Sequence, residues 1–398
     1  MFRLLSVLCL LGWGTVTTSQ TALHQQIEQF VQDALNTAGV VPGLSVAVVR
    51  DGEIFLLRGF GYRDVERQLP VTPQTGFYIA SVSKTLMGLA AAQLEHQGDI
   101  SLEMTLRKCF PEWEFWPPLD AGEITLLGLF SHRHPIRNSG LQYRLAFVDT
   151  MSEADFSRVL FDFSQPREAV FQYSNTSINI AAAALEAFTG RSWQSMVDEE
   201  VLQPLQMHHT TSAMSEAVRR EFAWPYLLVD GQWNKLAVKD DTQMQSAGGH
   251  VTTAEDFAQW LRAHLGNGIV EGNQLMPAEV IERVQTSYAD VDRDYYKFHR
   301  NGYGLGLYQA DFAGERLMHH FGGFEGYMAH ASFMPERGIG VAAFCNESML
   351  GGRLPHLVAA YIYELLLGKQ DVESRYRAEL QEWKQEIEAR QDQLADRL

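Results

Sequence analysis

Strand-forming patterns occupy both ends of this 398-residue chain, and a long helical stretch separates them. In the N-terminal part, the apolar runs 44–49 and 54–60 flank Asp51-Gly52, a dipeptide typical of tight hairpin turns. The later strand patterns cover 302–308, 327–334 and 339–345. Two such groups on either side of a helical stretch indicate one shared sheet. The sequence therefore predicts an α/β domain whose sheet is interrupted by a mostly helical insertion at about 102–265.

Three further segments show the apolar spacing of helices. A helix is predicted over 24–38, before the first strand, and an apolar closing helix over 354–367, after the last. A mostly buried helix is predicted over 81–97, where Ala, Leu and Met are frequent and Gly98 supplies a stop. The chain thus opens with a helix, two strands and a buried helix.

The tail 369–398 is richer in charged residues than the rest of the chain. One helical stripe of apolar residues runs through it, formed by Tyr376, Leu380, Trp383, Ile387 and Leu394. The stripe is short, which favours a helix packed on its own domain. The alternative is self-association through a coiled-coil contact of this helix.

The N-terminus has the layout of a secretory signal. Arg3 precedes the apolar run 4–13, and a small, polar stretch follows at 14–20. The run is too short to span a bilayer, which takes roughly 20 apolar residues. We therefore expect a signal peptide over 1–20 and export to the periplasm or the medium. An uncleaved anchor is the alternative.

The charge balance argues against nucleic acid as a partner. Lys and Arg number 32 and Asp and Glu number 49, so the formal net charge is −17 and little neutralises a phosphate backbone. After removal of the signal only Cys109 and Cys345 remain, and we expect both to be buried small side chains rather than a disulfide framework. His132 and His134 have no carboxylates or cysteines at recognised ligand spacing, so neither a metal nor a cofactor is predicted.

The first candidate for chemistry is Ser81-Val82-Ser83-Lys84. On a helix, residues three apart share a face, so the Ser81 hydroxyl and the Lys84 amine can meet. The first turn of a helix also has unpaired N–H groups. A lysine in a partly dry site loses its proton readily and can act as a base. Taken alone this motif is common, but here it follows a strand-like segment and begins an apolar helix.

Two further motifs carry polar groups suited to the same chemistry. In Tyr173-Ser174-Asn175, extended backbone would direct the phenol and the amide into one cleft. In His320-Phe321-Gly322-Gly323, the glycines allow close approach of a substrate, and an edge strand there can lend an N–H to an oxyanion. For the first motif the alternative is a plain loop tyrosine followed by a turn asparagine. For the second it is a turn that carries a surface histidine.

With Ser-x-x-Lys, Tyr-x-Asn and His-x-Gly in this order, the chain resembles the serine β-lactamase and class C penicillin-binding protein family. That family includes DD-peptidases, D-aminopeptidases and β-lactamase-like esterases. The resemblance extends over about 27–367, and further motifs that share in it are Pro42-Gly43, Ser246-Ala247-Gly248-Gly249 and Tyr303-Gly304-Leu305-Gly306. It implies a hydrolase domain over 24–368: an antiparallel sheet flanked by helices, with an inserted helical subdomain and the active site between them.

The resemblance also implies roles for individual residues. Ser81 would be the nucleophile, and Lys84 and Tyr173 would share the proton transfers, with either one as the base. The oxyanion hole would consist of the backbone N–H groups of Ser81 and Gly323. Substrate-binding roles would fall to Asn175, His320 and Gly322.

Two departures from the family pattern bear on the substrate. His320 and Phe321 stand where many relatives have Lys and Thr, so a charge and a hydroxyl that bind a substrate carboxylate are missing. Residues 131–135 replace a more usual loop sequence near the cleft. We therefore expect a serine hydrolase for small ester, amide or peptide substrates. The alternatives are a true β-lactamase, and a binding or regulatory domain of the same fold with weak catalysis.

Overall fold

A computed structural model describes residues 11–148 and 151–395. Residues 1–10 of the predicted signal peptide lie outside these ranges, and the first described element is helix α1, Leu11–Ala38. None of the helices in the described ranges is both long and apolar enough to cross a membrane.

One antiparallel sheet of nine strands forms the centre of the fold, in the order β12-β13-β14-β15-β16-β17-β1-β2-β3. Its strands are β1 Gly43–Arg50, β2 Glu53–Asp64, β3 Leu69–Pro70, β12 Ala289–Tyr295, β13 Phe298–Tyr303, β14 Tyr308–Phe312, β15 Glu315–Phe324, β16 Tyr327–Met334 and β17 Ile339–Cys345. β1 pairs with β17 along its length, so the N-terminal hairpin joins the C-terminal strands. The predicted single sheet is confirmed.

The glycine-alternating segment 302–308 is not one strand. β13 ends at Tyr303 and β14 begins at Tyr308, and the turn between them packs on helix α2, Ser83–Gln97. Gly306 has a φ of +84°, and a Cβ there would lie 2.3 Å from the Lys84 carbonyl oxygen. The alternating glycines therefore permit a turn to contact the helix, rather than forming one face of a strand.

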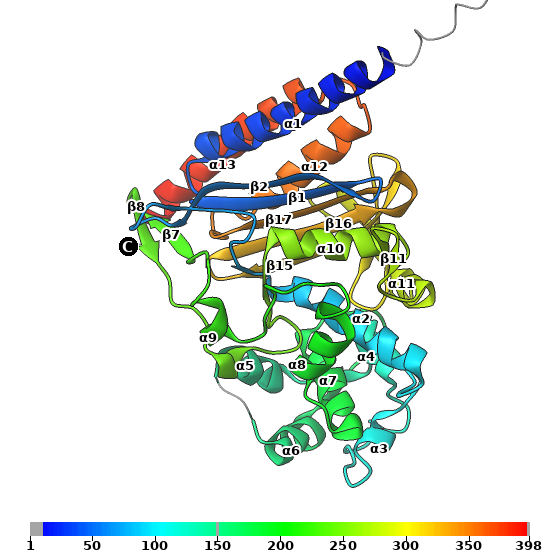
Figure 1. Cartoon of the computed structure of the whole chain (residues 1–398). Coiled ribbons are helices and arrows are strands. Elements are labelled where there is room, and N and C mark those ends of the chain that lie inside the picture. Colours follow the sequence, from blue (N-terminus) through cyan, green and yellow to red (C-terminus); the bar gives the residue numbers. More distant parts are fainter. Residues whose placement is uncertain (1–10, 149–150, 396–398) are drawn as a thin grey trace, which may run out of the picture.

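Helices cover both faces of the sheet (Figure 1). α1, α12 and α13 lie on one face, and α10 lies on the other, with α2 and α11 beside it. The helices not yet given bounds are α3 Leu106–Cys109, α4 Leu126–Phe130, α5 Ser139–Phe147, α6 Glu153–Phe163, α7 Asn175–Thr189, α8 Trp193–Val197, α9 Met214–Ala217, α10 Ala254–Leu265, α11 Ala278–Gln285, α12 Leu354–Leu366 and α13 Val372–Ala395. α3 to α9 form the lower part of the molecule in Figure 1.

The tail helix α13 packs on its own domain. Tyr376, Leu380, Trp383 and Ile387 are buried in a cluster that includes residues of α1 and α12. The side chain of Leu394, the last residue of the predicted stripe, lies outside the described side chains. Most of the stripe therefore serves intramolecular packing.

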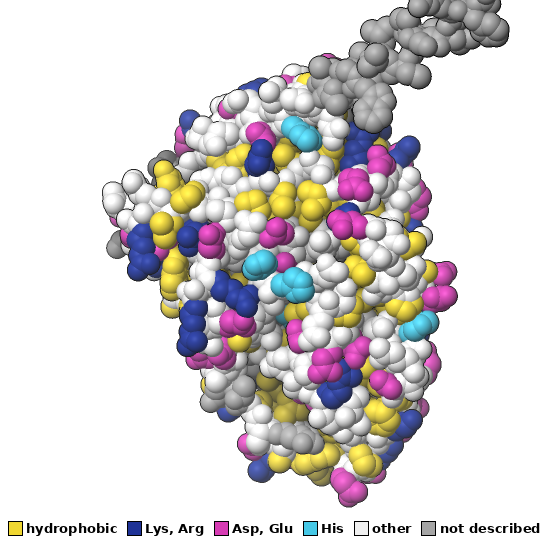
Figure 2. Space-filling model, in the orientation of Figure 1, with side chains coloured by type: hydrophobic (Ala, Val, Ile, Leu, Met, Phe, Trp, Pro, Cys, Tyr) yellow, Lys and Arg dark blue, Asp and Glu magenta, His cyan; other side chains and the backbone are white. Residues whose placement is uncertain are grey.

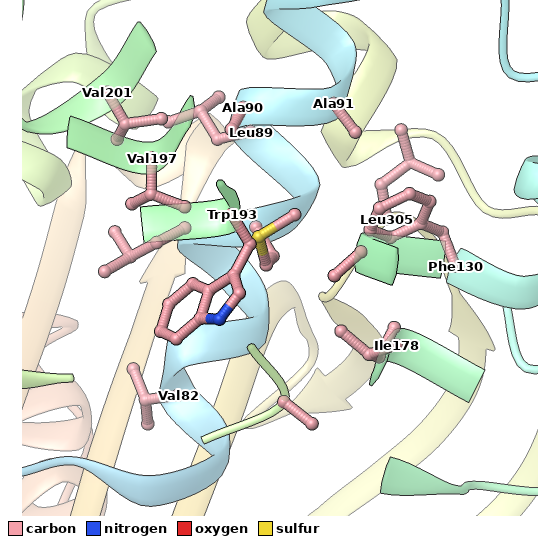
Figure 3. Packing of buried hydrophobic residues seen from close by; sticks show 14 of the residues in the cluster. Val82, Leu89, Ala90, Ala91, Phe130, Ile178, Trp193, Val197, Val201 and Leu305 are labelled. Atoms are coloured by element: carbon pink, nitrogen blue, oxygen red, sulfur yellow. The ribbon is translucent and has the colours of Figure 1, made fainter. Parts of the chain in front are cut away.

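Helix α2 is buried from Ser83 to Ala92, which explains why this part of its sequence lacks a polar face. In Figure 3, Trp193 and Val197 of α8 and nearby Val201 lie on one side of it, and Phe130, Ile178 and Leu305 lie on the other. This burial holds the start of α2 in a fixed place.

At the surface, acidic and basic side chains are intermingled on the face shown in Figure 2.

Candidate active site

Ser81 lies in a single 3₁₀ turn, Ala80–Val82, directly before α2. The helix predicted over 81–97 thus begins with this turn and ends as expected at Gly98, which has a φ of +84°. Ala80 has a φ of +44°, a left-handed conformation that costs free energy in a residue with a Cβ. The surrounding structure therefore holds the turn that carries Ser81 under backbone strain.

Strand β15 lies against this turn. β14 pairs with β15 only as far as His319, whereas β16 pairs with it up to Phe324. Among the described strands, only β16 pairs with the segment 320–324, and the other edge of this segment lies next to Ser81. Gly323 lines the same cavity as Ser81, which fits an oxyanion hole shared by the two residues.

Gly322 is required for this close approach. A Cβ at residue 322 would lie 2.0 Å from the Ile79 carbonyl oxygen and 3.0 Å from the Ser81 nitrogen. Gly322 does not line the cavity, so the structure gives it a packing contact rather than a substrate contact.

We expect Gly322→Ala to lower both thermal stability and hydrolysis, because the new methyl group must push the Ser81 turn away from β15. Overpacking of this kind typically costs about 1–3 kcal/mol. Gly323→Ala is the matched control, since its Cβ would meet only the flexible end of Met328, at 3.2 Å. Thermal melts of the two variants test the steric requirement, and ester assays of Gly322→Ala test its effect on hydrolysis. Equal losses of stability would contradict a special steric requirement at residue 322.

Lys84 is fully buried, and its amine contacts three polar atoms. Its Nζ is 3.0 Å from Ser81 Oγ, 2.7 Å from Asn175 Oδ1 and 2.7 Å from the Ala247 carbonyl oxygen. Burial holds the pKa of this amine well below its ordinary value, which favours the neutral form. A neutral amine has two N–H donors, which the Asn175 and Ala247 oxygens accept, and one lone pair, which remains for the Ser81 hydroxyl.

Tyr173 contacts the same hydroxyl. Its phenol interacts with the Ser81 side chain, and its ring centroid lies 4.9 Å from Lys84 Nζ. The residue as a whole is 37% exposed, but its hydroxyl is surrounded by protein, and this burial raises the pKa of the phenol. Tyr173 therefore keeps its proton and can donate it. The structure brings all three predicted catalytic residues together.

Asn175 reaches the site by a different local geometry from the one expected. Ser174 is extended, but Asn175 is the first residue of α7, so the pair Tyr173 and Asn175 does not lie on one strand. The Asn175 amide oxygen accepts a hydrogen bond from Lys84, and the residue also lines the cavity with Ser81. It can thus hold the amine and still face a substrate.

His320 lies beneath the site instead of in the cavity. It is buried, its Nδ1 donates to the Phe321 carbonyl oxygen at 2.8 Å, and its ring centroid is 5.9 Å from that of Tyr173. Burial and the nearby Lys84 hold its pKa well below the ordinary value, so the ring is neutral. The structure places His320 among the side chains that support Tyr173.

Sequence reasoning missed a second histidine that supports Tyr173. His132 is buried, and its ring centroid is 4.8 Å from that of Tyr173. Its Nδ1 is 2.6 Å from Ser177 Oγ, and its Nε2 is 3.1 Å from the Tyr303 hydroxyl. The only sequence signal was the altered loop 131–135.

No group of His, Cys, Asp and Glu that could hold a metal occurs among the described residues.

A serine beside a buried lysine and a tyrosine, set between an antiparallel sheet and a helical subdomain, is the arrangement that the sequence resemblance implied. The chain belongs to the beta-lactamase family, which it matches over residues 23–356.

Several known proteins are similar to the chain. Protein flp of Staphylococcus aureus strain MW2 is 24% identical over 332 residues, which cover 81% of this chain and 63% of flp. A beta-lactamase of Escherichia coli strain K12 is 28% identical over 259 residues, which cover 63% of this chain and 64% of that protein. The chain thus spans less than two thirds of the length of these curated relatives. The solved structure of the octameric penicillin-binding protein homologue from Pyrococcus abyssi superposes with a TM-score of 0.72 at 28% identity, covering 87% of this chain and 77% of that one.

Proposed function

We propose that the chain is a serine hydrolase that forms an acyl-enzyme on Ser81 and acts on ester, amide or peptide substrates. The observation that carries this proposal is the 3.0 Å contact between the Ser81 hydroxyl and the buried amine of Lys84, whose pKa is held low. A serine hydroxyl is a weak nucleophile unless a base within hydrogen-bond distance takes its proton. The pKa directions favour Lys84 as that base and Tyr173 as the acid.

In the acylation step, Ser81 Oγ forms a bond to the substrate carbonyl carbon while its proton passes to Lys84 Nζ. The carbonyl oxygen gains negative charge, which the N–H groups of Ser81 and Gly323 would stabilise. The bond to the leaving group then breaks, and the leaving atom takes the proton of the Tyr173 hydroxyl. The proton held by Lys84 replaces the one lost from Tyr173. Water releases the acyl group by the reverse transfers.

Tyr173→Phe separates the acid role from packing, because it removes the hydroxyl and keeps the ring. We expect kcat/KM for a methyl ester or an amide to fall about 10²–10³-fold, the usual cost of losing a proton-transfer group. A p-nitrophenyl ester should lose less than about tenfold, because p-nitrophenolate leaves without a proton. Tyr62→Phe, on the exposed side of β2, is the control and should change neither rate. Equal losses on both substrates would contradict an acid role.

The surroundings of β15 favour esters and peptides over β-lactams. Phe321 packs against Tyr295 and Phe298, and it supplies no hydroxyl for a substrate carboxylate. His320 is neutral and does not reach the cavity. A true β-lactamase is the second candidate, favoured by the likeness to the Escherichia coli beta-lactamase. A binding or regulatory domain is the third.

Intact-mass spectrometry after exposure to a penicillin and to a small panel of esters tests the proposal. A mass increase equal to the acyl group, mapped to the peptide that contains Ser81, would support the acyl-enzyme. A long-lived penicillin adduct would indicate a penicillin-binding protein, and rapid release would indicate a β-lactamase. No adduct and no turnover with any compound would leave a binding domain and overturn the proposal.

We also propose export by an N-terminal signal, supported by the pattern of residues 1–20. Secretion of a reporter fused to these residues would test it, and retention in the cytoplasm would contradict it.

Self-association is proposed from the likeness to the octameric homologue. Sedimentation velocity of the full chain would test it, and a lone monomer at high concentration would contradict it.

A further inference from the structure

The cavity that contains Ser81 has a volume of about 410 Å³, within the range of small-molecule sites. Its lining also includes four aromatic side chains, and Ser139, Gln142 and Gln245 add polar groups. Among the described residues that line it, Lys239 alone carries a charge. Lys239 lies in the segment between β8, Gln232–Lys235, and the 3₁₀ turn Asp241–Gln243, and the proton transfers described above do not use it.

Lys239 is held in place by backbone carbonyl oxygens rather than by an ion pair. It is 6% exposed, and its Nζ donates to the Ala146 and Gln243 carbonyl oxygens at 3.0 and 3.2 Å. In the described part of the chain, no Asp or Glu oxygen lies within ion-pairing distance of this amine. The neighbouring Asp240 attracts the amine electrostatically but forms no ion pair with it, and its carboxylate accepts from the Thr242 and Gln243 nitrogens.

Two carbonyl oxygens account for two of the three protons of an ammonium group, so a third donor remains. Burial lowers the pKa of Lys239 to about 8, and the amine is therefore still mostly protonated at pH 7. A buried cation that has no directly paired anion is costly unless a ligand supplies one. The Lys239 ammonium group can therefore bind an anionic group of a ligand.

Aromatic side chains surround this amine and form one wall of the cavity. Lys239 Nζ lies 4.5 Å from the Phe324 ring centroid. Phe324 also contacts Tyr78 and Phe147, and Phe147 contacts Tyr143, with ring centroids 5.3–6.2 Å apart. Tyr143 and Phe147 are 66% and 51% exposed at the mouth of the cavity. The wall would cover an apolar chain that ends at the ammonium group.

The position of Tyr173 indicates which part of a substrate enters. Tyr173 is not among the residues that line the cavity. The leaving group must reach the Tyr173 hydroxyl, so it lies outside, and the portion that stays attached to Ser81 occupies the cavity. We propose that the cavity binds the acyl portion of the substrate and that Lys239 pairs there with a carboxylate at the far end of that acyl group. This inference rests on the proposed acyl-enzyme at Ser81.

The test uses adipic, pimelic and suberic acids that carry a p-nitrophenyl ester at one end and a free carboxylate at the other. Each is compared with the compound in which this carboxylate is a methyl ester and so has no charge. Release of p-nitrophenol is measured in every case. We expect wild-type kcat/KM to favour the free acid on the order of 10–100-fold at one of the three lengths, as for a hydrogen bond between charged groups. Lys239→Met should abolish this preference and leave the methyl esters within about threefold of wild type. Lys384→Met removes a charge from the exposed surface of α13 and should keep the preference.

The outcomes separate this inference from the proposed function. Hydrolysis of every ester with no preference for the acids would overturn the role of Lys239 and leave the acyl-enzyme intact. Equal losses on acids and methyl esters in Lys239→Met would do the same. No hydrolysis of any ester would overturn both. The preference is measured first on the wild-type protein, so it stands as a test even if Lys239→Met fails to fold.

Discussion

Ser81→Ala is expected to reduce hydrolysis of a p-nitrophenyl ester about 10⁴–10⁶-fold, the loss seen when a serine hydrolase lacks its nucleophile. The substitution removes one oxygen and so the only bond through which an acyl-enzyme can form here. Ser81 is partly exposed, and Lys84 keeps its contacts with Asn175 and Ala247, so the melting temperature should stay within about 2 °C of wild type. Mass spectrometry should detect no acyl adduct.

Ser83→Ala provides the matched control two residues away. Ser83 is buried, and its hydroxyl accepts a hydrogen bond from the His250 nitrogen at 3.1 Å. Its loss should cost about 1–3 kcal/mol of stability, because a buried N–H loses its partner, while hydrolysis continues. Ser81→Ala should thus lose hydrolysis and keep its stability, whereas Ser83→Ala should lose stability and keep hydrolysis. Retained turnover in Ser81→Ala would refute the assignment of the nucleophile.

Lys84→Met is expected to lower kcat/KM about 10²–10⁴-fold, because it removes the base and keeps a side chain of similar size. The loss should appear with the p-nitrophenyl ester as well as with an amide, since attack by Ser81 precedes departure of either leaving group. This separates Lys84 from Tyr173, whose effect should depend on the leaving group. A change of only a few-fold would count against Lys84 as the base.

The wild-type pH profile gives a second test of Lys84. Its neutral form is the active one, and burial lowers its pKa, so activity should be lost as the pH falls through that lowered pKa and should be fully present above it. The pKa of Tyr173 is raised, so the acid form should persist into the alkaline range. A profile that rises steadily towards the ordinary lysine value of 10.5 would contradict the neutral amine.

Some parts of the fold and site could be predicted because they depend on near neighbours in the chain. Asp51 and Gly52 adopt φ values of +52° and +81°, the left-handed turn that such a dipeptide favours. The Ser81 and Lys84 side chains meet because they are one turn apart at the start of a helix. The strands 327–334 and 339–345 were predicted with the bounds they have in the structure.

Other features of the fold and site depend on contacts between segments that are far apart in the sequence. Local sequence patterns do not predict these contacts. His320 was expected to contact substrate, yet it lies under Tyr173, because the face of β15 that carries it packs against the interior of the site. The segment 302–308 was expected to be a strand, and contact with α2 makes it a turn. Lys239 carried no sequence signal for its position, and the only signal for His132 was the altered loop 131–135.

By itself, the sequence determined the opening helix and hairpin, the strands 327–334 and 339–345, and the pairing of a hydroxyl with an amine, since hydrophobic period and helical spacing act over a few residues. Only the tertiary structure decided that this amine is poised to act as a base. The oxygens that accept its protons belong to Asn175 and Ala247, which are 91 and 163 residues further along the chain. The low pKa of Lys84 arises from burial, and burial is a property of the whole packed fold.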